Sequence, residues 1–143
     1  MEIKFEILGE PMGKQRPKST SVNGFVRNYT PAKTVNYETL VKQVYQQTSG
    51  HWFGKVALKG EISIYYKLEK KHYGKKGINK EGQDKLNGLI RPIKTPDFDN
   101  CEKIIYDALN GIAYDDDKQI VDNHTKKFYA EQPRVEVYIT DEV

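Results

Sequence analysis

Three stretches of strict alternation between apolar and polar residues constrain the fold most strongly. Residues 2–9, 60–68 and 134–140 each place a branched or aromatic apolar residue at every second position. Successive side chains of a strand point to opposite faces, so this alternation is typical of a strand with one buried face. The sequence therefore predicts three half-buried strands.

A fourth segment, over about residues 31–48, carries apolar residues at helical spacing. Thr30 is a favourable N-cap, and Pro31 suits the first helical position because its missing N–H has no partner there in any case. Gly50 is a typical stop. The sequence thus predicts a helix whose apolar residues include Tyr37, Leu40, Val41 and Val44.

A second helix is predicted from Asp99 to Asn110. Asp99 and Glu102 have the spacing of a capping box, and Gly111 is a typical C-terminal stop. One face of this helix is apolar, which predicts that it packs against a core. The apolar positions are Cys101, Ile104, Ile105, Ala108 and Leu109.

The remaining segments complete the prediction of a single domain over residues 1–143. Residues 118–129 form a further predicted strand, joined to 134–140 as a hairpin near 131–133. Residues 9–17 predict a loop, and 69–94 a long connection without periodicity, which is usually mobile or functional. No repeat is present, and 143 residues suit one core. We expect an α/β (α+β) fold with four to five strands and two main helices.

Charge is divided sharply between two adjacent blocks. Residues 67–94 carry nine lysines and arginines against three acids, a net charge of +6, whereas the whole chain is only +3. Residues 97–117 carry seven acids against one base, a net charge of −6. This pattern favours a protein that binds a polyanion with one part and a cation with another.

Membrane and secreted classes are disfavoured by the sequence. No apolar stretch is long enough to span a bilayer, and the first residues lack the apolar core of a secretion signal. Cys101 is the single cysteine, which excludes an intrachain disulfide. We therefore expect a cytoplasmic protein.

The segment from Thr95 to Lys103 carries the candidate chemistry. If Asp97 to Asp99 is extended, both carboxylates point the same way and repel unless a cation lies between them. Hard divalent cations prefer oxygen ligands, so this pair indicates a metal site. Lys103 lies one helical turn after Asp99 and is suited to meet charge on a phosphate.

Each of these residues also has an ordinary structural explanation. Asp99 can serve only as a helix cap, and Lys103 can form a surface ion pair with Asp99 or Asp107. The run 115–117 can be a solvated turn, or it can double back toward the helix start and supply a third carboxylate. An EF-hand is excluded because its glycine and closing glutamate are missing when counted from Asp97. His72 and His124 lack metal-type spacing and are predicted to be surface residues.

The sequence resembles the RusA family of Holliday junction resolvases, which are common in bacteria and their phages. Three motifs carry the resemblance, in the same order as in the family, and with the strands between them they cover nearly the whole chain. They are Gly9-Glu-Pro-Met-Gly-Lys14-Gln-Arg16-Pro17, then Pro96-Asp97-Phe98-Asp99-Asn100 with Lys103 and Asp107-Ala-Leu-Asn-Gly111, then Tyr114-Asp-Asp-Asp117-Lys-Gln119-Ile120.

The resemblance implies a homodimer built on a mixed sheet, with a Mg²⁺ cofactor (Mn²⁺ as the alternative) and symmetric paired cuts at four-way DNA junctions. It implies that Asp97, Asp99 and Asp117 act in catalysis with Lys103. The implied metal ligands are Asp97, Asp99, Asp116 and Asp117, and the extra Asp115 leaves the register of the third ligand open.

The basic residues of two segments are candidate DNA ligands. Lysine and arginine on a loop can follow a bent phosphate backbone, although a solvated loop explains them equally well. The candidates are Lys14, Arg16, Lys18, Lys75 and Lys76. Three other functional classes stay open: a structure-tolerant metal nuclease, a catalytically silent DNA-binding protein, and a metal-regulated interaction module.

Overall fold

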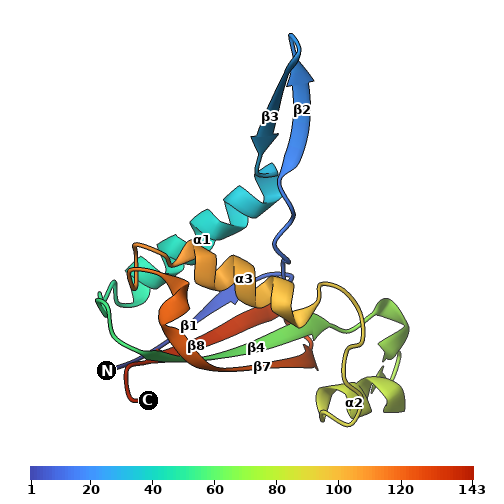
Figure 1. Ribbon diagram of the computed structural model, residues 1–143. Coiled ribbons are helices and arrows are strands. Elements are labelled where there is room, and N and C mark those ends of the chain that lie inside the picture. The colour runs from blue at the N-terminus through green and yellow to red at the C-terminus, as the bar shows by residue number, and fades with distance from the viewer.

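A four-stranded sheet forms the centre of the computed structural model, which describes residues 1–143 (Figure 1). In spatial order its strands are β1 (Glu2–Leu8), β8 (Arg134–Thr140), β4 (Leu58–Lys67) and β7 (Ile120–Ala130). Strand β8 pairs antiparallel with strands β1 and β4, and β4 pairs in parallel with β7. The sheet is therefore mixed, as predicted.

Two helices, α1 (Ala32–Thr48) and α3 (Phe98–Ala108), cover one face of this sheet (Figure 1). The alternating apolar residues of β1, β4 and β8 are buried beneath them, so the predicted half-buried strands and the α+β class are confirmed. The helices contribute Tyr37, Val41 and Tyr45 from α1 and Cys101, Ile104 and Ile105 from α3 to the same core.

Both predicted helix starts were displaced by one position or more. Pro31 occupies the N-cap position of α1, so Thr30 is not the cap. Asp97 occupies that position in α3, because its carbonyl oxygen accepts the first helical hydrogen bond, from the amide of Cys101 at 3.2 Å. Asp99 therefore lies inside the first turn, and the predicted extended Asp97–Asp99 pair and the Asp99 cap were wrong.

The predicted hairpin between the last two strands was also wrong. Strand β4 lies between β7 and β8, and the link 131–133 crosses the end of β4. Two strand spacings are only about 10 Å, which a link of this length spans easily. The same local turn signal occurs in a hairpin between adjacent strands and in a link that crosses a third strand. The sequence pattern alone therefore did not distinguish the two connections.

Residues 69–94 are folded, contrary to the predicted structureless connection. The segment contains a 3-10 turn (Lys70–His72), a two-stranded ribbon of β5 (Tyr73–Gly74) and β6 (Gly77–Ile78), and helix α2 (Lys80–Leu86). These elements are too short to show a periodic pattern. Tertiary contacts hold these elements in place instead.

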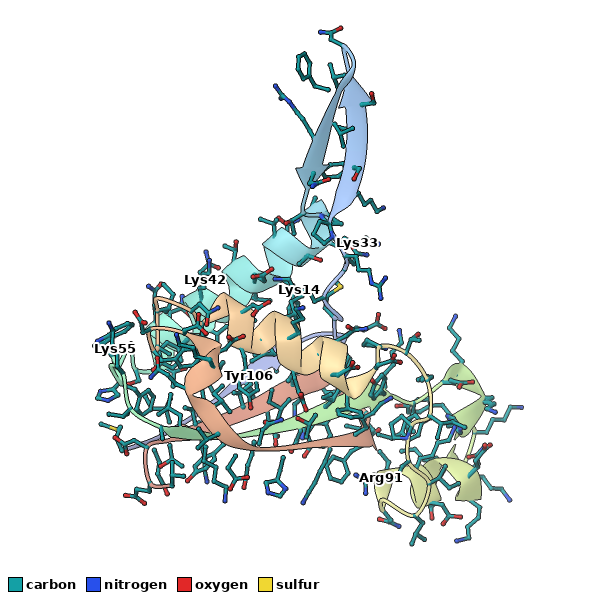
Figure 2. All side chains as sticks on the ribbon, viewed as in Figure 1. Lys14, Lys33, Lys42, Lys55, Arg91 and Tyr106 are labelled. Carbon is teal, nitrogen blue, oxygen red and sulfur yellow. The ribbon has the colours of Figure 1, made fainter.

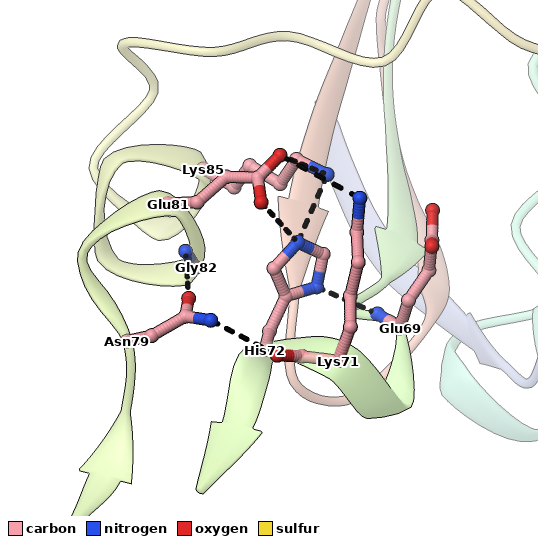
Figure 3. Close-up of polar contacts among 7 residues, drawn as sticks. All are labelled: Glu69, Lys71, His72, Asn79, Glu81, Gly82 and Lys85. Carbon is pink, nitrogen blue, oxygen red and sulfur yellow. Dashed lines mark hydrogen bonds and ion pairs between the residues drawn. The ribbon is translucent and has the colours of Figure 1, made fainter.

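His72 is the centre of those contacts (Figure 3). Its side chain is fully buried, so the prediction of a surface histidine was wrong. The backbone amide of Glu69 donates to its Nδ1 at 3.0 Å, and Lys85 Nζ lies 3.1 Å from its Nε2. Glu81 Oε2 lies 3.6 Å from the same nitrogen. His124, in contrast, is exposed as predicted.

A second hairpin, β2 (Lys18–Val22) and β3 (Phe25–Tyr29), projects away from the sheet (Figure 1). This hairpin was not predicted from the sequence, although Asn-Gly between two strands is the strongest short-range hairpin signal. Asn23 and Gly24 both have positive φ values, 52° and 79°, as a tight turn of this kind requires. None of the helices is long and apolar enough to cross a bilayer.

Candidate active site

One face of α3 carries most of the polar residues of the candidate site. Positions 99, 102, 103, 106 and 107 are three or four residues apart, so they lie on the same side of the helix. Together with residues that follow the helix they line a shallow hollow of about 340 Å³. Its lining consists of Asp99, Glu102, Lys103, Tyr106, Asp107, Asp117, Ile120 and Asn123.

Asp117 reaches this hollow because the chain turns back immediately after α3. Gly111 adopts a φ of 74°, and its amide donates to the carbonyl oxygen of Tyr114 at 2.7 Å. The amide of Asp117 then donates to Asn110 Oδ1 at 2.8 Å. The third carboxylate thus returns to the same face of α3, but beside Asp107 near the helix end rather than at the helix start.

The carboxyl groups of Asp117 and Asp107 face each other. Burial, and next a hydrogen bond between the two carboxyl groups, raise the pKa of Asp117 to about 6. Burial also opposes ionisation of Asp107, but hydrogen bonds from Asp117 and Lys14 lower its pKa overall. Two carboxyl groups held this close favour a shared proton or a shared cation.

Lys14 compensates part of this negative charge. Its Nζ lies 2.9 Å from Asp107 Oδ2 and 3.3 Å from Glu38 Oε1, and it links the first loop (residues 9–17) to both α1 and α3. Burial lowers the pKa of Lys14, but its hydrogen bonds and charge interactions with Asp107 and Glu38 raise it overall. Its ammonium group thus has two carboxylate partners within the protein.

Asp97 lies in a neighbouring hollow of about 360 Å³, which the first loop closes. The amide of Lys14 donates to the carbonyl oxygen of Asn100 at 3.1 Å, so the loop is tied to the start of α3. Gly13 makes this approach possible: a Cβ there would lie 3.0 Å from Pro96 Cβ and 3.2 Å from Asn100 Cβ. The structure therefore places Asp99, Lys103 and Asp117 in the lining of one hollow and Asp97 in the lining of another, at the start of α3.

The two other aspartates of the late run have different surroundings. Asp116 caps the short turn at Asp117–Gln119, and its Oδ1 accepts from the amide of Lys118 at 2.9 Å. That hydrogen bond, followed by one from Asp117, lowers the pKa of Asp116. Asp115 is exposed and does not line the hollow. Of the three, Asp117 alone lines the hollow.

A hydrogen-bonded chain forms the floor of the hollow. Tyr106, between α3 and the sheet (Figure 2), donates from its hydroxyl to Asn123 Oδ1 at 2.5 Å. Asn123 Nδ2 in turn donates to Glu102 Oε1 at 2.9 Å. Glycine at position 60 leaves room for the Tyr106 hydroxyl, because a Cβ there would overlap it. This chain holds Glu102 in place and connects α3 to β7.

Four polar residues of this site were not predicted from the sequence to belong to it. Glu102, Tyr106 and Asp107 follow Asp99 at helical spacing, so extending the helical pattern from Asp99 identifies them. Asn123 lies on a strand and gave no local signal. The ion pairs around the hollow are those of Lys14, and Lys103 takes part in none of them.

The other candidate DNA ligands lie apart from the hollow's floor. Arg16 and Lys18 are exposed, on the loop and at the start of β2. Lys75 and Lys76 are exposed at the turn between β5 and β6. Lys14 is less accessible than these four, since only 23% of its side chain is exposed.

The side chains of the hollow fit a hard divalent cation in their chemistry. They supply carboxylate oxygens, and Asp107 and Asp117 are already paired. No three acidic, histidine or cysteine side chains are gathered closely enough to bind a metal by themselves. Mg²⁺ does not need such a cluster, because it commonly takes one or two carboxylates and fills its other positions with water and substrate phosphates.

Comparison with known proteins decides the family. Residues 9–140 match the family described as endodeoxyribonuclease RusA. The chain belongs to the RusA endodeoxyribonuclease family. The resemblance seen in the three motifs is thereby confirmed, and membership indicates endodeoxyribonuclease activity. A relative in Bacillus subtilis (strain 168), named Uncharacterized protein YqaN, is 37% identical over 139 residues, which cover 97% of this chain and 96% of the relative.

Proposed function

We propose that this RusA-family protein is a Mg²⁺-dependent endonuclease that resolves four-way DNA junctions by paired phosphodiester cleavage. Its biological setting would be DNA recombination and repair. The observation that carries the proposal is that Asp99, Lys103 and Asp117 line one hollow, although the first and the last lie 18 positions apart in the sequence. Carboxylates with a lysine are the set required to bind a cation and a phosphate together.

The proposed cation ligands are Asp97, Asp99, Asp116 and Asp117. Asp99 and Asp117 line the hollow, Asp97 lies in the adjoining one, and Asp116 contacts Asp117. A bound divalent cation supplies a Lewis acid that activates water and neutralises the leaving oxygen. Asp107 adds a carboxylate beside Asp117 and increases the local negative potential that attracts a cation.

Lys103 is proposed to bind the phosphoryl oxygens of the substrate. It lies on α3 between Asp99 and Asp107, about 6 Å along the helix axis from each. Because it takes part in none of the site's ion pairs, its ammonium group is available to a substrate. A cation at this position opposes the negative charge that builds on the phosphate during attack.

Paired cleavage requires two such sites in one assembly. A four-way junction has two-fold symmetry, and a symmetric homodimer presents two equivalent hollows to it. Arg16, Lys18, Lys75 and Lys76 are proposed to contact the phosphates of the arms, with Lys14 contributing through the first loop. Replacing any of the four exposed residues by alanine should flatten the salt dependence of junction binding.

Comparison of substrates tests the proposal. Wild-type protein is incubated with a four-way junction, a fork, a duplex and a single strand of matched sequence, with Mg²⁺ or with EDTA. We expect symmetric cuts in the junction only, and only with Mg²⁺. Asp97→Asn, Asp99→Asn and Lys103→Ala should abolish cleavage, while the two aspartate variants bind the junction as tightly as wild type or more tightly.

Each competing class gives a different result in the same assay. Equal cleavage of all four substrates indicates a structure-tolerant metal nuclease. Junction binding without cleavage indicates a silent DNA-binding protein, and no salt-sensitive DNA binding indicates an interaction module. Full cleavage by Asp97→Asn would contradict the proposed site itself.

A further inference from the structure

The β2–β3 hairpin is an arm whose two strands pair only with each other. All ten strand residues are exposed to solvent. Its strands join no other sheet, and Figure 1 shows them extending beyond the end of α1. An isolated two-stranded hairpin is marginally stable in water. Stability of the core therefore does not explain why the chain carries this element.

The two faces of the hairpin differ in chemistry. Cross-strand partners share a face, and successive pairs alternate between faces. Ser19 pairs with Asn28 and Ser21 with Val26, so one face is mostly small and polar. The other face carries every basic and aromatic residue of the hairpin. Its pairs are Lys18 with Tyr29, Thr20 with Arg27, and Val22 with Phe25.

The charge around the hairpin has one sign. Residues 11–37 contain five lysines and arginines and no acid. The aromatic side chain at the tip, Phe25, is 74% exposed, and Tyr29 near the base is 48% exposed. A partner that suits this face must be negatively charged and must offer flat apolar surfaces. Nucleic acid combines both, because phosphates surround stacked bases.

Both ends of the arm are fixed beside the candidate site. Before β2, the amide of Gln15 donates to Thr34 Oγ1 at 3.3 Å, and Lys14 is tied to α3. After β3, Pro31 leads directly into α1. The base of the arm is thus anchored to α1 and to α3, and α3 carries most of the hollow. DNA bound at the hollow and extending along α1 would reach the arm, which continues beyond the end of that helix (Figure 1).

We propose that the β2–β3 hairpin is a DNA-binding arm that lays its basic and aromatic face along the phosphate backbone and stacks Phe25 on a base at the branch point. This inference rests on the proposed junction substrate. A branch point interrupts base stacking, so a base there is accessible to an aromatic ring, whereas an intact duplex keeps its bases stacked. Apolar side chains that enter such steps are a known way to hold distorted DNA.

Phe25 and Val26 provide a matched pair for the test. They are adjacent, similarly exposed at 74% and 71%, and on opposite faces of the hairpin. Binding of Phe25→Ala and Val26→Ala to a four-way junction and to a duplex is measured in EDTA, so that nothing is cut. We expect Phe25→Ala to bind the junction about tenfold more weakly, the usual loss for one stacked base, with little change for the duplex. Val26→Ala should bind both as wild type does.

A fluorescent junction reports the contact directly. With 2-aminopurine at the branch point, wild type and Val26→Ala should change its emission on binding, and Phe25→Ala should not. The same base placed within an arm should respond equally to all three proteins. The inference is overturned if Phe25→Ala matches Val26→Ala in affinity and emission, or if Phe25→Ala changes only the oligomeric state in light scattering.

These outcomes are separable from failure of the proposed function. If wild type cuts junctions with Mg²⁺ but the two variants behave alike, the arm proposal is wrong and the junction nuclease stands. If wild type neither binds nor cuts junctions, the proposed function is wrong and the arm proposal falls with it.

Discussion

Replacing Asp117 by asparagine should stabilise the protein in the absence of divalent cations. The pKa of Asp117 is raised from 3.8 to about 6 by burial and by the facing carboxyl group of Asp107, so ionisation at neutral pH opposes folding. An asparagine amide has no charge and can still donate a hydrogen bond to Asp107. The backbone amide at position 117 keeps its bond to Asn110.

The magnitude follows from this rise in pKa. For an isolated carboxyl group, a rise from 3.8 to about 6 corresponds to about 3 kcal/mol at neutral pH. Asp117 is only partly buried and shares its proton with Asp107, so screening and coupling reduce this to about 1 kcal/mol. For a chain of this size we expect a rise in melting temperature of about 3 °C.

The pH dependence of the stability difference between Asp117→Asn and wild type gives the more specific test. The pKa of Asp117 is higher in the folded protein than in the unfolded chain. Protonated Asp117 therefore costs wild type nothing below pH 3.8, and the stability is lost as pH rises through about 6 and the group ionises. Thermal unfolding in EDTA should therefore show Asp117→Asn above wild type at pH 7.5, with the difference vanishing near pH 3.8. Asp115→Asn, at an exposed position, should match wild type at both pH values. Equal or lower stability of Asp117→Asn at pH 7.5 would refute the reasoning.

Three further substitutions test other parts of the structure. Gly60→Ala should cost about 1–3 kcal/mol in chemical unfolding, because its Cβ overlaps the Tyr106 hydroxyl; an unchanged unfolding midpoint would contradict the packing. His72→Ala should cost about 2–3 kcal/mol and expose residues 69–94 to hydrogen exchange, since the Glu69 amide loses its acceptor and the buried Lys85 loses its polar neighbour; unchanged protection there would count against this core. Lys14→Met should lower stability by about 1 kcal/mol at pH 7.5, and by less once the pH falls below 3.8 and Asp107, whose pKa Lys14 helps to lower, becomes protonated; an equal loss across this range would argue against a charge effect.

The central sheet and its two main helices could be predicted because their patterns are long. Three alternating stretches and two helical stripes each bury one face, and that requirement fixes what they become. The link at 131–133 shows that local patterns do not predict the order of strands in the sheet. Its residues indicate a turn, but whether another strand lies beside the turn depends on where β4 runs, which no local pattern contains.

The residues of the candidate site were predicted better than their arrangement in space. Asp99, Lys103 and Asp117 do share a hollow, yet the expected extended pair of Asp97 and Asp99 is absent because α3 begins earlier than its cap signal suggested. Helical spacing from Asp99 would have added Glu102 and Asp107. Asn123 could not have been found, since only the parallel pairing of β4 with β7 places it beside α3.

Cleavage of a synthetic four-way junction by Asp117→Asn and Asp115→Asn, side by side with wild type in Mg²⁺, tests the central claim most directly. The neighbouring aspartates differ chiefly in position: one carboxyl group faces Asp107 within the hollow, and the other is exposed to solvent. The account predicts no cuts from Asp117→Asn and a wild-type rate from Asp115→Asn. Wild-type cleavage by Asp117→Asn would contradict it.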